Sequence, residues 1–333
     1  MGLALADAKL RGKWTFSLCF LHEGLTSGET DGMNMLQRWI RKLAIGLGAA
    51  ATAAAALLPQ AAEAKAGPAL WSVSDADTTV YLFGTIHLLP EKTSWRTEKF
   101  DAAVKGSNEL VVETIIDDKN PAQLMSILAK LAISPGLPPI AERVPPAKRA
   151  ALAAAIKKSA IPAPAFDRME TWAAAFMLLG NQYRDLGLKG GEGVEAVLRS
   201  SFSSEGKPIG ELETNAEQLG FFDALPEHAQ RQLLEGAIEA PGDTSKEFGK
   251  MLSSWTKGDV AAIARSFNRD LAGSPELMDA LIKRRNANWS KWIEQRMTKP
   301  GAVMIAVGAG HLAGPGSVVD LLQRDGFKVR RVQ

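Results

Sequence analysis

The chain has 333 residues and a formal net charge of +2, with 46% hydrophobic and 23% charged residues. This composition is typical of a globular protein with a sizeable core, and the small net charge gives no indication of a nucleic-acid-binding surface. The single cysteine, Cys19, excludes a disulfide framework and a cysteine-based zinc site.

The N-terminal part of the chain resembles a targeting segment. Residues 35–64 have the features of a secretory signal peptide: a basic start, an uncharged run over 43–58, and small residues at Ala62 and Ala64 for cleavage. The alternative is a membrane anchor, but the apolar run is short and rich in alanine for a span that needs about 20 residues. We therefore expect cleavage near Ala64.

The residues before this segment have no place in a signal peptide. Met33 and Met35 stand just before the basic start, so residues 1–34 are interpreted as a mis-assigned upstream extension. The expected product is a single domain at residues 65–333 that is periplasmic or secreted, with no membrane span after cleavage.

Predicted strands cluster at both ends of the remaining chain and near residue 210, with helices between them. Strands are predicted at Leu70–Ser74, Thr79–Phe83, Glu109–Glu113, Lys207–Glu213, Ala302–Val307 and Phe327–Val332. Helices are predicted at Thr97–Lys105, Pro121–Leu131, Ala147–Ser159, Thr171–Gly180 and Ala216–Leu225, and over much of residues 227–295 and 317–325. This order fits an α/β or α+β core whose sheet is assembled from distant segments, with a helical insertion.

Two of the predicted strands end in the same short motif, Gly-x-x-His. The first motif contains Gly84 and His87, and the second contains Gly308 and His311. If these strands are parallel, both histidines meet at the carboxyl edge of the sheet, together with Glu113 at the end of a third strand. Two imidazoles and a carboxylate form a ligand set for Zn²⁺, Mn²⁺ or Fe²⁺, and metal-bound water would supply a nucleophile.

Simpler interpretations of these residues stay open. Each histidine could be a hydrogen-bonded structural residue, and Glu113 could be an ordinary ion-pair partner. Arg285 lies on a long predicted helix, where it belongs either to a solvated face or to the site, holding an anionic group. His228 is expected to be exposed on a helix.

Five motifs in order resemble one known family, the TraB/GumN family, over about residues 68–333. They are Tyr81–His87, Leu110–Glu113, Gly210–Leu219, Arg285–Trp289 and Val307–Gly314. The family is similar to the Tiki metalloproteases, the erythromycin esterases and the ChaN-like haem-binding proteins. The resemblance implies an α/β fold of two related halves, each of which gives one Gly-x-x-His to a shared cleft.

The resemblance also implies roles for individual residues. His87, His311 and Glu113 match the positions that serve a divalent-metal peptidase in the Tiki branch. Glu213, which follows another strand, is a second candidate carboxylate, and Arg285 is carried over as a further site residue.

The expected function is that of a metal-dependent hydrolase acting on peptide bonds. His87 and His311 would bind Mn²⁺, Zn²⁺ or Co²⁺, and Glu113 would be a ligand or the general base. Arg285 would stabilise an oxyanion or bind a substrate carboxylate. Two alternatives are a non-catalytic binder of peptides or haem and a metal-free hydrolase with a histidine as base.

Overall fold

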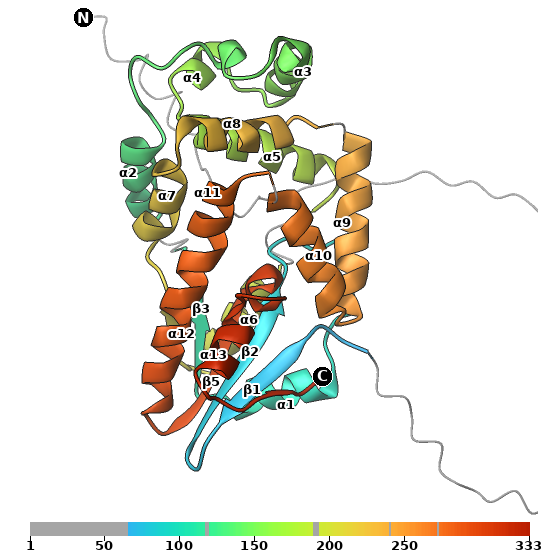
Figure 1. The fold of residues 1–333 in the computed structure, drawn as a ribbon, viewed down its shortest axis with the longest axis vertical. Coiled ribbons are helices and arrows are strands. Elements are labelled where there is room, and N and C mark those ends of the chain that lie inside the picture. Colours follow the sequence, from blue (N-terminus) through green and yellow to red (C-terminus); the bar gives the residue numbers. More distant parts are fainter. Residues whose placement is uncertain (1–65, 117–119, 189–192, 240, 272) are drawn as a thin grey trace, which may run out of the picture. The chain divides into compact units, whose positions relative to one another are not determined.

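The computed structural model describes residues 66–116, 120–188, 193–239, 241–271 and 273–333 (Figure 1). The predicted upstream extension and signal peptide lie outside these residues. All of the described residues belong to one compact unit.

The described part of the chain contains a six-stranded mixed sheet with the strand order β4-β3-β5-β2-β1-β6. Its strands are β1 (Leu70–Ser74), β2 (Thr78–Thr85), β3 (Glu109–Val112), β4 (Ile209–Glu211), β5 (Gly301–Gly308) and β6 (Val329–Arg331). The pairs β2–β5, β5–β3 and β3–β4 are parallel, whereas β1 is antiparallel to both β2 and β6. The predicted α/β class, with strands from both ends of the chain in one core, is confirmed.

The pairing of β2 with β5 brings the two Gly-x-x-His motifs together. Thr78 lies opposite Gly301, and the register continues to Thr85 opposite Gly308. Both strands therefore end at the same edge of the sheet. The two histidine motifs, which are far apart in the sequence, begin side by side.

The central strands are apolar because helices cover both faces of the sheet. Phe83 and Met304 belong to the core on one face, which packs against α1 (Glu98–Gly106) and α6 (Val194–Ser204). The alternating residues, such as Ile305, pack on the other face against α12 (Arg284–Met297) and α13 (Val318–Arg324). The two Gly-x-x-His motifs lie between these helical layers, at the edge of the sheet where β2 and β5 end.

The helical insertion lies between β3 and β5 in the sequence, interrupted by β4. Figure 1 shows many of its helices at one end of the sheet, opposite the β1–β2 turn. These helices are α2 (Pro121–Leu131), α3 (Arg149–Lys158), α4 (Ala163–Asp167), α5 (Thr171–Asp185), α7 (Asn215–Asp223) and α8 (Glu227–Gly236). They are followed by α9 (Pro241–Thr256), α10 (Val260–Leu271) and α11 (Pro275–Met278).

The insertion has its own apolar core. Leu178 of α5 and Leu234 of α8 are buried in it, so the predicted core helix at Thr171–Gly180 is confirmed and continues to Asp185. Among the described helices, none has both the length and the apolar character that crossing a bilayer requires.

Candidate functional site

The carboxyl edge of the sheet holds the three residues that the sequence singled out. Glu113 directly follows β3, His87 follows β2, and His311 lies in a short 3₁₀ turn, η5 (Ala309–Leu312), after β5. A Cβ atom added to Gly308 would lie 3.2 Å from Glu113 Oε1, 3.6 Å from His311 Cδ2 and 3.8 Å from His87 Nε2. The structure thus gathers all three side chains around the open side of one glycine.

Arg285 lies at the centre of a buried cluster behind this point. Its Nη2 contacts Glu113 Oε2 at 2.7 Å and Glu213 Oε2 at 2.8 Å, and its Nε donates to both Glu213 oxygens at 3.0 Å. Its Nη1 lies 3.2 Å from His311 Nε2 and donates to the Leu281 carbonyl at 3.4 Å. Arg285 therefore joins both carboxylates and the second histidine, all of them buried.

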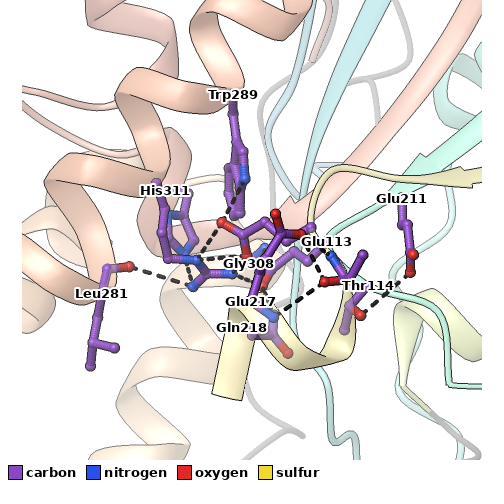
Figure 2. A network of polar contacts seen from close by, with 12 residues as sticks. Glu113, Thr114, Glu211, Glu217, Gln218, Leu281, Trp289, Gly308 and His311 are labelled. Carbon is purple, nitrogen blue, oxygen red and sulfur yellow. Dashed lines mark hydrogen bonds and ion pairs between the residues drawn. The ribbon is translucent and has the colours of Figure 1, made fainter. Parts of the chain in front are cut away.

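The two carboxylates have further donors. Glu113 Oε1 accepts the Gly308 amide at 2.6 Å, and Glu113 Oε2 accepts the Gln218 side-chain amide at 3.2 Å. Glu213 Oε1 accepts Trp289 Nε1 at 3.0 Å. Figure 2 shows Glu113, Gly308 and Gln218 close together, with Trp289 and His311 nearby in the same network. Every oxygen of the two buried carboxylates thus accepts at least one hydrogen bond, as burial of a charge requires.

Local helix chemistry places these side chains. Thr214 and Glu217 form a capping box at the start of α7, which fixes the helix just after Glu213 and directs Gln218 to Glu113. A π-helical turn, η4 (Asp279–Lys283), precedes α12. Such turns are frequent at functional sites, and this one comes immediately before the helix that carries the central arginine.

Asn286 fixes the protonation of His311. His311 Nδ1 lies 2.7 Å from Asn286 Oδ1, and the Asn286 amide nitrogen donates to the Gly316 carbonyl at 2.8 Å. The amide is therefore oriented with its oxygen toward the ring, so His311 Nδ1 carries the proton and Nε2 accepts from Arg285. Burial and the charge of Arg285 lower the pKa of His311 to about 4, although Glu113 opposes them.

The two carboxylates of the cluster respond differently to the same arginine. Burial disfavours the Glu113 carboxylate, but the charges of His311 and Arg285 and the Gly308 amide outweigh it and lower the pKa to about 2. Burial raises the pKa of Glu213, and Arg285 opposes this only in part. Burial acts against the charged form of Arg285, yet the two carboxylates raise its pKa. Glu113 is thus held ionised and is a weak base, and Glu213 is the more easily protonated of the two.

The neutral state of buried His311 predicts a specific dependence of stability on pH. Its folded-state pKa of about 4 lies below the ordinary 6.5, so the unfolded chain takes up a proton first as the pH falls. The free energy of unfolding should therefore decrease by about 3 kcal/mol between pH 6.5 and pH 4 from this group. Glu113 adds a further loss below pH 4.5, down to about pH 2.

This pH dependence can be tested with His311→Gln, which cannot titrate. Urea denaturation at half-unit pH intervals should show a shallower decline in the variant than in the wild type between pH 6.5 and pH 4. Equal slopes in that window would contradict the assignment of a buried neutral His311.

His87 differs from His311 in exposure and in partner. Its Nδ1 lies 2.7 Å from Glu195 Oε1, and 64% of its side chain is exposed. Thr85 donates a hydrogen bond to the same Glu195 oxygen. The charge of Glu195 raises the pKa of His87 above its ordinary 6.5, against the effect of burial, and solvent at the exposed side of the ring limits the shift. This contact orients the ring and leaves Nε2 directed away from Glu195.

A cavity of about 330 Å³ opens beside His87. It lies between the sheet edge and helices α5, α6 and α7, and its size suits a small ligand or a single side chain. Its wall includes His87, Glu113, Phe176, Tyr183, Arg199 and Gln218. The exposed histidine and the ionised Glu113 thus share one cavity, whereas Arg285 and His311 are not part of its wall.

Two of the three predicted metal ligands, His311 and Glu113, face protein groups in this structure. His311 turns Cδ2 toward the open side of Gly308, while its Nε2 faces Arg285. The Glu113 oxygens accept from Gly308 and Arg285. In the part of the chain that the structure describes, no three His, Cys, Asp or Glu side chains are placed to hold a metal ion. Metal ligation by these residues stays a prediction.

The structure places Arg285 among buried protein partners. The sequence suggested an arginine that holds an anionic group, and Arg285 does hold two, but both belong to the protein itself. Its guanidinium is buried and its donors are used within the cluster. Glu213 is likewise a buried partner of Arg285 and Trp289 and does not line the cavity.

Sequence reasoning missed Glu195, Gln218 and Asn286 as site residues. Glu195 lies in the first turn of α6, where an acidic residue is ordinary, so nothing in the local pattern marked it. Gln218 and Asn286 lie within two of the family motifs but had no assigned role. The available signal was their position in the sequence: Gln218 comes shortly after Glu213, and Asn286 directly follows Arg285.

Comparisons with known proteins agree with the motifs. A family model described as the TraB/PrgY/gumN family matches residues 69–331. The chain is similar to the uncharacterized protein YbaP of Escherichia coli strain K12, with 24% identity over 247 residues, which cover 73% of this chain and 87% of that protein. The same values hold for YbaP of Shigella flexneri. No solved structure matches the chain. The chain belongs to the TraB/PrgY/gumN family.

Proposed function

We propose that this protein is a hydrolase of amide or ester bonds in which His87 is the general base. The observation that carries the proposal is the 2.7 Å contact between His87 Nδ1 and Glu195, which leaves Nε2 at the edge of a cavity. A carboxylate on one ring nitrogen orients the imidazole and stabilises the imidazolium that forms when the other nitrogen accepts a proton.

The proton path uses residues that lie together in the described structure. Neutral His87 accepts a proton from water through Nε2, and the resulting hydroxide attacks the substrate carbonyl carbon. The imidazolium, held by the charges of Glu195 and Glu113, then returns the proton to the leaving amine or alcohol as the carbon–nitrogen or carbon–oxygen bond breaks. Glu113, with a pKa of about 2, acts as a fixed negative charge and not as the proton acceptor.

The buried cluster has a supporting part in this proposal. Arg285 holds Glu113, and His311 is fixed as a neutral ring that accepts from Arg285. The cluster thereby keeps Glu113 ionised at the sheet edge beside His87. Hydrogen bonds already hold this carboxylate in position, so no group has to move for it to act.

The test is a panel of fluorogenic peptides and nitrophenyl esters, assayed with the full-length protein and with His87→Gln. We expect turnover that His87→Gln abolishes and that persists after chelator treatment. Turnover lost to chelator and restored by Mn²⁺ or Zn²⁺ would instead favour the metal-dependent hydrolase expected from the sequence. No turnover on any substrate, or turnover that does not depend on His87, would contradict the proposal.

A further inference from the structure

The cavity beside His87 has an apolar side. Phe176, Leu179 and Tyr183 of α5 contribute to its wall, together with Ile116 after β3. Gly180 also faces it from the same helix, and the absence of a side chain at that position leaves room. This side is suited to an aromatic or branched aliphatic group.

Arg199 lies on the cavity wall one helical turn after Glu195. Residues four apart share one face of a helix, about 6 Å apart along its axis, so Arg199 is near the carboxylate that holds His87. Its Nη2 donates to the Ile116 carbonyl at 2.8 Å. A guanidinium has five N–H donors, and this is the hydrogen bond that Arg199 makes in the described part of the chain. With respect to the described residues, donors therefore remain for a group in the cavity.

The two carboxylates on the wall have cationic partners within the protein. Glu195 is paired with His87, and Glu113 with Arg285. Arg199 is half-buried and has no carboxylate partner among the described residues. A singly charged anion matches this single cation. A phosphate dianion would be repelled more strongly by Glu113 and Glu195, because the repulsion grows with the charge of the ligand.

We infer that the cavity binds an apolar group that carries a carboxylate, with the carboxylate on Arg199 and the apolar group against α5. The C-terminal residue of a peptide, or an N-acylated apolar amino acid, has this chemistry. Its carboxylate carbon lies three bonds from the acyl carbonyl carbon, at most about 4 Å away. Glu195 and Arg199 are one helical turn apart, about 6 Å along the axis of α6, so the carbonyl can lie near His87 while the carboxylate contacts Arg199. That such a compound is also hydrolysed rests on the proposed function, whereas its binding to the cavity does not.

The experiment measures binding, so it does not depend on turnover. Calorimetric titration of the full-length protein compares 3-phenylpropanoate with the neutral 3-phenylpropanamide, which has nearly the same shape. We expect the carboxylate to bind at least about tenfold more tightly, as for one ion pair with hydrogen bonds in a partly desolvated site. Arg199→Gln should remove this preference, and Arg199→Lys should retain part of it.

The apolar side is tested with a matched pair of glycine variants. Gly180→Leu should fill the cavity and weaken both ligands at least about tenfold. Gly249→Leu, at an exposed helical glycine with open space around it, should leave both affinities unchanged. Thermal unfolding confirms that each variant is folded before it is compared.

The outcomes separate this inference from the proposed function. No binding of either compound, equal binding of both by the wild type, or a preference that survives in Arg199→Gln would overturn the inference. A carboxylate preference without hydrolysis of N-acetylphenylalanine would retain the site and count against the hydrolase. Hydrolysis that depends on His87 but is equally fast for N-acetylphenylalanine and its amide would retain the hydrolase and overturn the carboxylate site.

Discussion

Arg285→Met should reduce the free energy of unfolding by about 3–5 kcal/mol at pH 7. The wild-type guanidinium contacts Glu113 at 2.7 Å and Glu213 at 2.8 Å, and all three side chains are less than a tenth exposed. Methionine fills a similar volume but leaves two buried carboxylates without a cation. Urea denaturation of both proteins at neutral pH measures the loss.

A neighbouring arginine provides the control. Arg284 forms an ion pair with Asp279 at 2.9 Å, but its side chain is 55% exposed, so Arg284→Met should cost less than about 1 kcal/mol. Because burial already raises the pKa of Glu213, adding Glu213→Gln to Arg285→Met should recover part of the stability. Equal losses from Arg284→Met and Arg285→Met would contradict the central place of Arg285.

His87→Gln should lower kcat/KM about 10²- to 10⁴-fold on any substrate that the protein turns over, the range of a lost general base. Stability should change by less than about 0.5 kcal/mol, because the side chain is mostly exposed. Only the neutral ring accepts a proton, and Glu195 raises the pKa of His87 above 6.5, so the wild-type rate should rise with pH through a value above 6.5. In Glu195→Gln this rise should move to lower pH and the maximal rate should fall.

His228→Gln is the matched control for this prediction. His228 lies on α8 with a side chain that is 63% exposed, and it contacts Glu276 at 3.3 Å, so it resembles His87 in exposure and in having an acidic partner. Its replacement should leave kcat/KM unchanged. A similar loss of activity in both variants, or full activity in His87→Gln, would be inconsistent with the proposed role of His87.

Much of the fold could be predicted from the sequence because parallel strands buried on both faces have an uninterrupted apolar pattern. The runs ending at Phe83, Val112 and Val307 are of this kind, and each lies in the central part of the sheet. The predicted bounds of the edge strands were less accurate: the predicted strand Lys207–Glu213 shortens to Ile209–Glu211, since β4 has a single partner strand, β3, in the described sheet.

The meeting of His87, Glu113 and His311 also followed from the sequence, since each residue comes just after a strand and parallel strands end at one edge. The orientation of the side chains did not follow from it. Asn286 turns His311 Nε2 to Arg285, and this depends on contacts across 25 residues and on the Gly316 carbonyl. Neither local periodicity nor strand position contains such information.

The partner of His87 shows the same limit. Glu195 reaches it from the first turn of α6, a helix that covers one face of the sheet. Many acidic residues in the chain lie in the first turn of a helix. The packing of α6 against β2 and β3 is what brings Glu195, and not another of them, to His87. The sequence therefore predicted where a site lies, whereas the pairing of donors and acceptors within it required the structure.

A histidine NMR titration tests the central claim most directly, because it needs no substrate. The wild type should show one ring with a pKa above 6.5 that is absent in His87→Gln and shifts downward in Glu195→Gln, and a second ring with a pKa well below 6.5 that is absent in His311→Gln. If the His87 resonance titrates at its ordinary 6.5 and does not respond to Glu195→Gln, the oriented base at the sheet edge is contradicted.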